Sequence, residues 1–211
     1  MATSDNHPTR VYRWVGERGL RVETGETTLA RYRLLMAHAF AEIEDIIPAD
    51  QTLLVVLHPG TAPSPALHSA LGVPLTTALH AEGALHRIPV EYGGDAGPDL
   101  GAMAALAGMD VDAYIRCHAA AEYNVAFLGF QPGFPYLGGL PGALCAARRA
   151  TPRTRIEAGS VGIGGCYTGI YPRPGPGGWH IIGRTDVVLF DAVRASPSLL
   201  LPGDRIRFVP Q

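Results

Sequence analysis

FLGFQPGFPYLGGLPG, residues 127–142, begins the part of the chain that decides its fold. It is followed by ATPRTRIEAGS (150–160) and GIGGCYTGIYPRPGPGGWHIIGRT (162–185). Of the 26 glycines in the sequence, 14 fall between Leu128 and Arg184, together with 7 of the 18 prolines. Six aromatic residues lie in the same stretch and need a packed environment, which argues against a disordered linker. We therefore predict that the glycines serve tight turns and close backbone approach around a site.

The composition describes an ordinary globular protein. Of its 211 residues, 47% are hydrophobic and 17% charged, and the formal net charge is -2. This balance lacks the basic excess that binding to a phosphate backbone requires, so we expect no nucleic-acid partner. All 17 basic residues are Arg, which excludes a Schiff-base lysine, a lysine base and a Walker-type phosphate loop. Any anion site must use Arg or backbone amides.

The cysteines and histidines suggest neither a disulfide framework nor a metal site. The three cysteines are odd in number and lack a CxxC spacing, and we expect Cys166 to act as a small buried hydrophobe. None of the eight histidines shows an HxxxH or HxH spacing. The first ten residues lack the apolar core of a signal peptide, and no stretch approaches 18 apolar residues. We expect a reduced, cytoplasmic protein that does not span a membrane.

The first part of the chain predicts a small α/β domain, to which we assign residues 1–88. Short strands are expected at 11–15 and 20–22, followed by a helix whose apolar face runs from Leu29 to Ile43. The continuous apolar run at 53–57 is typical of a buried strand. Helical spacing continues from 65 to 81, and 87–92 is a further strand candidate.

Residues 89–211 predict a second domain rich in β structure. Pro98 is well placed to start a helix at 100–106, and Asp110 resembles the N-cap of a second helix at 111–121. A strand is expected at 123–127. Short β runs then follow at 159–164, 179–183, 187–190 and 205–209, separated by Gly and Pro turns. This spacing indicates a small barrel or a sandwich.

Arg153 and Arg155 form the clearest polar cluster. In an extended segment, residues two apart project to the same face, so these two guanidinium groups would suit a carboxylate or a phosphate. The alternative is a solvated strand edge with weak surface ion pairs.

Two other residues have candidate catalytic chemistry. Ser160 lies in AGSVG, which nearly matches a nucleophile elbow, but the first glycine and the following helix are missing, so a hydrogen bond in a turn is favoured. His118 lies on the helix before the glycine-rich stretch. It has the chemistry of an acid, a base or a ligand-orienting group, although a lone histidine is more often structural.

Aromatic residues in the glycine-rich stretch suggest a pocket wall. Phe134, Tyr171 and Trp179 would line it, with Arg184 at the end of the Trp179 strand facing its mouth. The alternative is a core in which Trp179 merely packs, because an aromatic side chain does not by itself distinguish a pocket from a core.

The order of these motifs resembles the allophanate hydrolase subunit 1 family, also called the KipI family. The motifs are GFQPGFPYLGGLP, RRATPRTRIEAGSVGI, TGIYPRPGPGGWHIIGRT, LFD and LLLPGDRIRFVP, and EYGG and GPDL before them also fit. The resemblance covers over half of the chain tightly and the first ninety residues loosely. This sequence departs from the family pattern at residues 165–168, where relatives commonly carry a small residue followed by Gln. Tyr167 is therefore expected to alter the pocket or its specificity.

The resemblance implies an α+β protein: a small N-terminal α/β domain followed by a cyclophilin-like β-barrel domain. Members include a subunit of the bacterial ATP-dependent 5-oxoprolinase, an inhibitor of a sensor histidine kinase, and part of the carboxyltransferase region of urea carboxylase. They act with a chain of the allophanate hydrolase subunit 2 type. Because the sequence ends at Gln211, directly after the barrel motif, we expect that partner to be a separate chain.

Carried over by position, the family pocket implies a catalytic group and a substrate-binding group. The catalytic candidates are His118, Arg153, Arg155 and Ser160, and the substrate-binding candidates are Phe130, Pro132, Tyr171, Trp179 and Arg184.

The leading functional hypothesis is a subunit of an ATP-dependent hydrolase that opens 5-oxoproline to glutamate. We expect it to act with the subunit 2-type partner and with a possible third component. ATP belongs to the complex and is placed at no residue of this chain. The alternatives are a complex that hydrolyses allophanate or a carboxylated urea, and a non-enzymatic inhibitor of a sensor histidine kinase.

Overall fold

A computed structural model describes residues 11–75 and 83–211. The chain divides into two compact units, Met1–His80 and Ala81–Gln211, each with its own apolar core. The predicted boundary at residue 88 differs from this division. The physical reason is that β5 (Leu85–Tyr92) pairs with two barrel strands and so belongs to the second unit.

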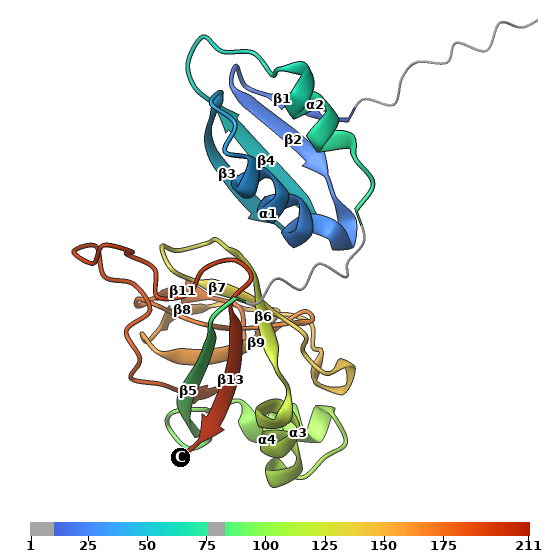
Figure 1. Cartoon of the computed structure of the whole chain (residues 1–211). Helices are drawn as coiled ribbons and strands as arrows, with labels where there is room; N and C mark the ends of the chain where they lie inside the picture. The colour runs from blue at the N-terminus through green and yellow to red at the C-terminus, as the bar shows by residue number, and fades with distance from the viewer. Residues whose placement is uncertain (1–10, 76–82) are drawn as a thin grey trace, which may run out of the picture. The chain divides into compact units, whose positions relative to one another are not determined.

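The first unit is a four-stranded antiparallel sheet with two helices on one face (Figure 1). Its strands lie in the order β1 (Arg13–Val15), β2 (Gly19–Glu23), β4 (Thr52–Leu57) and β3 (Ile43–Ala49). The 3-10 turn η1 (Gly25–Thr27) leads into α1 (Thr28–His38), and α2 (Pro65–Gly72) follows β4. Alternate β4 side chains are fully buried, which is the pattern of a sheet covered on one face.

Two predictions in the first unit are wrong in extent. The helix expected to reach Ile43 ends at His38, where Ala39 takes a left-handed backbone with φ 45°, and the chain then forms β3. Pro48 is tolerated in β3 because this strand lies at the edge of the sheet. The helix expected over 65–81 ends at Gly72, and the end of that range, 76–81, lies outside the described residues.

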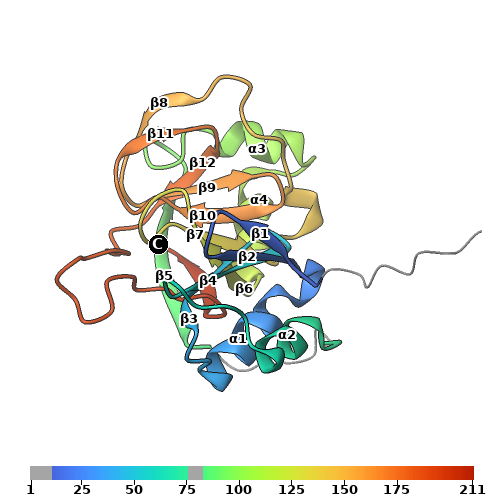
Figure 2. The same ribbon diagram turned by 90° about the horizontal axis from the view of Figure 1, so that it is seen from above.

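The second unit is a closed seven-stranded barrel, which decides between the barrel and the sandwich. The strand order is β10-β7-β6-β13-β5-β12-β9, and only the β13–β5 pair among these is parallel. The remaining barrel strands are β6 (Tyr123–Leu128), β7 (Pro135–Gly138), β9 (Ser160–Gly164), β10 (Tyr167–Ile170), β12 (His180–Arg184) and β13 (Arg205–Pro210). A separate two-stranded sheet joins β8 (Arg153–Ile156) to β11 (Gly175–Gly177), as Figure 2 shows.

Two helices precede the barrel's glycine-rich strands. They are α3 (Leu100–Leu106) and α4 (Val111–Ala120), and they pack beside each other outside the barrel (Figure 1). The predicted N-cap is confirmed, since Asp110 Oδ1 accepts a hydrogen bond from Ala113 N at 2.6 Å. None of the helices within the described ranges is long and apolar enough to cross a membrane.

The strand predicted at 187–190 is wrong. This segment forms only an isolated bridge between Phe190 and Ser198, within the loop that Figure 2 shows extending between β12 and β13. The short 3-10 helix η2 (Gly142–Leu144) also lies between strands.

Candidate functional site

Phe130 stands out on the surface of the second unit. It lies in the turn between β6 and β7, has a left-handed backbone with φ 66°, and is 58% exposed. A bulky residue with positive φ is rare, and such backbone outliers cluster at sites that bind ligands or partners. The turn is closed by hydrogen bonds from Gln131 N to Gly129 O at 2.7 Å and from Phe134 N to Gln131 O at 3.0 Å. The family resemblance implied Phe130 as a substrate-binding residue, and that role stays a prediction.

A group of stacked and edge-on aromatic rings lies behind Phe130. Phe134 is central: its ring centroid is 5.5 Å from Phe130, 5.1 Å from Tyr171 and 5.3 Å from Trp179. Phe134, Tyr171 and Trp179 are buried, whereas Tyr136 at the side of the cluster is half-buried. Phe134, Tyr171 and Trp179 thus pack as a core, as in the alternative interpretation, and their role as a pocket wall stays a prediction.

A second set of rings extends this edge. Phe127 and Tyr136 stack with centroids 4.3 Å apart, and Tyr167 meets both rings edge-on at 5.7 and 5.8 Å. All three are half-buried. We call Phe127, Tyr136 and Tyr167 the aromatic edge. Burial raises the pKa of Tyr136, so its phenol stays protonated and neutral at pH 7.

Glycine at position 164 lets the cluster pack against the barrel wall. A Cβ built there would overlap the indole of Trp179, so only a glycine allows the ring to lie against β9. Gly133 similarly has φ 78°, and a Cβ there would lie 2.8 Å from Phe190 Cβ. The predicted use of glycine for close approach is confirmed at these positions.

Asp99 organises the arginines beside the cluster. Its carboxylate accepts two hydrogen bonds from Arg153, at 2.7 and 2.9 Å, and one from Arg149 at 3.2 Å. It also accepts a hydrogen bond from Ile181 N at 2.7 Å. Burial alone would raise the pKa of Asp99, but the hydrogen bonds from Arg153 and Ile181 outweigh it, so the pKa is lowered. Sequence reasoning missed Asp99 as a site residue, although GPDL was part of the family pattern.

The predicted pair of free arginine forks is not what the structure shows. Arg153 is bound to Asp99, and Arg155 donates to Glu157 at 2.7 Å. The two guanidinium groups therefore have different carboxylate partners. Arg155 and Glu157 are exposed, as in the alternative interpretation of a solvated strand edge.

Ser160 and Arg184 are neighbours in the sheet, opposite one another in the β9–β12 pairing. Ser160 is buried, whereas Arg184 is exposed and lines a small cavity of about 290 Å³ with Glu91, Asp186 and the terminal Gln211. Neither residue is among the ring contacts around Phe134. Pro132 is exposed near Phe130, in the same turn.

His118 lies in the barrel core, where solvent does not reach it. Its Nδ1 is 2.8 Å from Tyr92 Oη and its Nε2 is 3.1 Å from Thr168 Oγ1, and its ring stacks on Phe208 at 4.7 Å. Complete burial lowers the pKa of His118 to about 3, so the imidazole is neutral at pH 7. This placement supports the structural interpretation of His118 rather than the catalytic one.

Cys145 and Cys166 are joined by a disulfide, which contradicts the prediction of no disulfide framework. Cys166 is exposed at the turn between β9 and β10 rather than buried. The pairing was hidden because the two residues are 21 positions apart and meet only through the barrel topology. Cys117 is the free cysteine.

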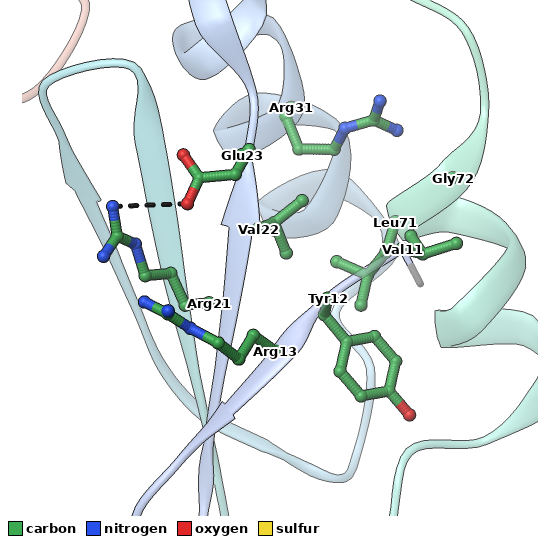
Figure 3. A pocket seen from close by; sticks show the side chains of 9 residues that line it. All are labelled: Val11, Tyr12, Arg13, Arg21, Val22, Glu23, Arg31, Leu71 and Gly72. Carbon is green, nitrogen blue, oxygen red and sulfur yellow. Dashed lines mark ion pairs between the residues drawn. The ribbon is translucent and has the colours of Figure 1, made fainter. Parts of the chain in front are cut away.

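A pocket of about 860 Å³ lies in the first unit (Figure 3). Arg31 lines it, but its guanidinium points to the end of α2, where it donates to Val73 O at 2.6 Å and to Ala70 O. Arg21 pairs with Glu23 at 3.2 Å. Arg31 therefore has a structural function in capping a helix. Within residues 11–75 and 83–211, no group of three or more His, Cys, Asp or Glu side chains is placed to hold a metal ion.

The fold is that of a closed β-barrel protein with an additional sheet-and-helix unit. The chain belongs to the family described as carboxyltransferase domain, subdomain C and D, which it matches over residues 10–200.

Similar proteins support this assignment. The chain is 55% identical over 134 residues to the 5-oxoprolinase subunit designated B of Escherichia coli O157:H7, covering 64% of this chain and 62% of that protein. The match thus spans about three fifths of the relative's length. A stretch of 62 residues is 42% identical to urea amidolyase of Saccharomyces cerevisiae, covering 28% of this chain and 3% of that protein. The crystal structure of TTHA0988 superposes with a TM-score of 0.78 at 33% identity, covering 92% of this chain and 40% of that one.

Proposed function

We propose that the chain is a subunit of an ATP-dependent amide or lactam hydrolase complex, a 5-oxoprolinase that converts 5-oxoproline to glutamate. The observation that carries this proposal is the 55% identity to the corresponding 5-oxoprolinase subunit of Escherichia coli O157:H7. We propose a subunit 2-type chain of the allophanate hydrolase family as its partner, with a third subunit completing the complex.

The accessible part of the aromatic cluster is the proposed contact with substrate. Phe130 and Pro132 lie at the surface, and Tyr171 and Trp179 support them from beneath. A small lactam ring has apolar faces that such rings can cover. Phe130 stands at the rim with a strained backbone, which is a feature of sites that bind ligands or partners.

The polar candidates have different proposed tasks. Arg153 positions β12 and α3 through Asp99, which also accepts from Ile181 N and precedes α3. Arg155 forms an exposed pair with Glu157, so a substrate anion or a partner carboxylate can replace that pair. Arg184 is exposed opposite the buried Ser160 in the β9–β12 pairing, and we assign Arg184 to contact with the partner.

ATP is assigned to the complex and not to a residue of this chain. The run Gly162–Gly165 forms the end of β9 and its turn, and Trp179 packs on it, so it does not present backbone amides at a helix N-terminus as a phosphate loop does. A lactam is a weak electrophile, and ATP supplies the driving force for opening it. We derive no step of this chain through the nucleotide.

Reconstitution tests the proposal. The chain would be combined with its subunit 2-type partner and the third component, and each of 5-oxoproline, allophanate and urea would be supplied with ATP. Glutamate reports on 5-oxoproline, ammonia reports on allophanate and urea, and ADP reports on the use of ATP. We expect ATP-dependent glutamate formation that is lost when this chain is omitted. Turnover of allophanate or urea without turnover of 5-oxoproline would contradict the proposal.

Turnover of allophanate or urea without turnover of 5-oxoproline would favour the alternative of a urea amidolyase-type complex. The 42% identity to urea amidolyase over 62 residues is the observation that keeps this alternative. A stoichiometric complex with a sensor histidine kinase that blocks autophosphorylation would instead indicate an inhibitor.

A further inference from the structure

The segment from Cys145 to Arg149 is fixed beside the aromatic edge. Its first residue is bonded to Cys166 in the β9–β10 turn. Ala146 exchanges two backbone hydrogen bonds with Gly165, at 3.0 and 2.7 Å. This end of the segment is therefore held next to the turn that leads directly into Tyr167.

The other end of the segment is held next to Trp179. His180 Nε2 lies 3.0 Å from Ala147 O, and Arg149 N donates to Gly178 O at 2.8 Å. Arg149 also donates to Asp99. The backbone is thus anchored immediately before and immediately after Arg148.

Arg148 itself is exposed at the middle of this anchored segment. Across residues 11–75 and 83–211, no hydrogen bond or ion pair involves its guanidinium. Arg149, Arg153 and Arg155 differ, because each donates to a carboxylate of the protein. A ligand anion can therefore bind Arg148 without breaking an existing ion pair, and the fixed backbone reduces the ordering cost.

The charge of Arg148 acts on the tyrosines of the cluster. Burial raises the pKa of both Tyr136 and Tyr171, and the positive charge of Arg148 opposes that rise in each. The geometry agrees, because the Cys145–Cys166 disulfide and the backbone pairing of Ala146 with Gly165 hold this segment beside the turn that leads into Tyr167 of the aromatic edge. An unpaired cation beside an apolar aromatic surface suits a small ring compound that carries a carboxylate.

We propose that Arg148 binds the carboxylate of the substrate while the lactam ring lies against the aromatic edge of Phe127, Tyr136 and Tyr167. This inference rests on the proposed function and identifies the group that selects an anionic lactam over a neutral amide. A guanidinium fork can hold both oxygens of a carboxylate, so Arg148 fixes the orientation of the ring as well as its charge.

The test is steady-state kinetics of the reconstituted complex with Arg148→Met and Arg148→Lys. Because the carboxylate is unchanged during ring opening, Arg148 binds ground state and transition state alike. We expect Arg148→Met to raise KM for 5-oxoproline by about 30- to 100-fold with kcat within about 2-fold. Arg148→Lys keeps the charge without the fork and should give an intermediate KM.

A neutral analogue separates this contact from a general loss of structure. 2-Pyrrolidinone is the same lactam without the carboxylate, and its inhibition constant should be equal for the wild type and Arg148→Met. The matched control is Arg116→Met, since Arg116 on α4 is also exposed and has no ion pair with any described residue. It should leave KM unchanged.

The possible failures are distinguishable. A wild-type complex that does not turn over 5-oxoproline overturns the proposed function and this inference with it. A wild-type complex that is active, with an unchanged KM in Arg148→Met, overturns the inference alone. An equal loss of affinity for 2-pyrrolidinone would also overturn it, because the effect would not depend on the carboxylate.

Discussion

The Asp99 carboxylate joins three parts of the second unit. It lies at the N-terminus of α3, binds Arg149 and Arg153 from the segment before β9, and accepts from Ile181 N in β12. Only 10% of its side chain is exposed, so its negative charge depends on these partners. Loss of a buried carboxylate that accepts hydrogen bonds from several elements is expected to lower the free energy of unfolding more than loss of a surface ion pair.

We predict that Asp99→Asn lowers the free energy of unfolding by about 2 kcal/mol. Asn keeps the size but loses the charge that Arg153 requires. Urea denaturation at pH 7 measures the change, and Asp191→Asn is the control, because its pair with Arg194 is 38% exposed on both sides. Because the folded-state pKa of Asp99 is lowered, its contribution is present above about pH 4 and is lost as pH falls through that folded-state pKa. Equal effects of the two substitutions would contradict this account.

His118 predicts a second pH dependence. Its pKa is about 3 in the folded state against 6.5 for the ordinary group, so between these values the unfolded chain binds a proton that the folded chain does not. The contribution of His118 to the free energy of unfolding is therefore fully present above pH 6.5. Below that pH it falls by about 1.4 kcal/mol per pH unit. When the pH is lowered from 7 to 5, the free energy of unfolding of His118→Gln, measured by urea denaturation, should fall by about 2 kcal/mol less than that of the wild type. A protonated His118 imidazole at pH 5 by NMR would contradict this explanation.

The sequence showed which residues were unusual but not which way they point. Tyr114 and His118 are four apart on α4, and both face the core, which the helical period predicts. The helical spacing does not determine whether the face of α4 that carries His118 is exposed to solvent or packs against the barrel. Likewise, alternation placed Arg153 and Arg155 on one side of a strand, but their carboxylate partners come from different positions in the chain.

At the level of elements, the disulfide connects the segment that follows η2 to the β9–β10 turn. This link holds the part of the chain that carries Arg148 next to Tyr167. It also closes a loop with a sequence separation of 21 residues, which limits the unfolded chain.

We predict that Cys145→Ser reduces the free energy of unfolding under oxidising conditions by about 3 kcal/mol. A reducing agent should cause a similar loss in the wild type and no further loss in the variant. Cys117→Ser is the control, because Cys117 is free. A wild-type protein whose stability does not respond to reduction would show that the pair does not contribute.

Most elements with an apolar run or an N-cap were predictable, whereas the start of β3 was taken for the end of a helix and three short strands with glycine or proline were missed. β4, β5, β6 and both barrel helices follow from apolar runs and N-caps. β7, β10 and β11 were missed because their glycines and prolines remove the side-chain alternation that identifies a strand. Their backbone pairing comes from neighbouring strands, as in the register of β10 with β9.

At the level of the whole molecule, we propose that the aromatic cluster is half of a site. Phe130 is exposed on its turn, and its ring meets those of Phe134 and Tyr171 edge-on. The order of the family motifs in the sequence predicted the barrel and singled out Phe130 and Tyr171 as candidate site residues. It did not reveal Asp99, whose partners are 50 or more positions away in the chain.

The most direct test is calorimetric binding of 5-oxoproline to the isolated chain and to the complex with its subunit 2-type partner. If this chain supplies half of a site, the isolated chain should show no measurable binding up to about 1 mM, whereas the complex should bind at least about tenfold more tightly. Binding by the isolated chain as tight as that of the complex would contradict the central claim.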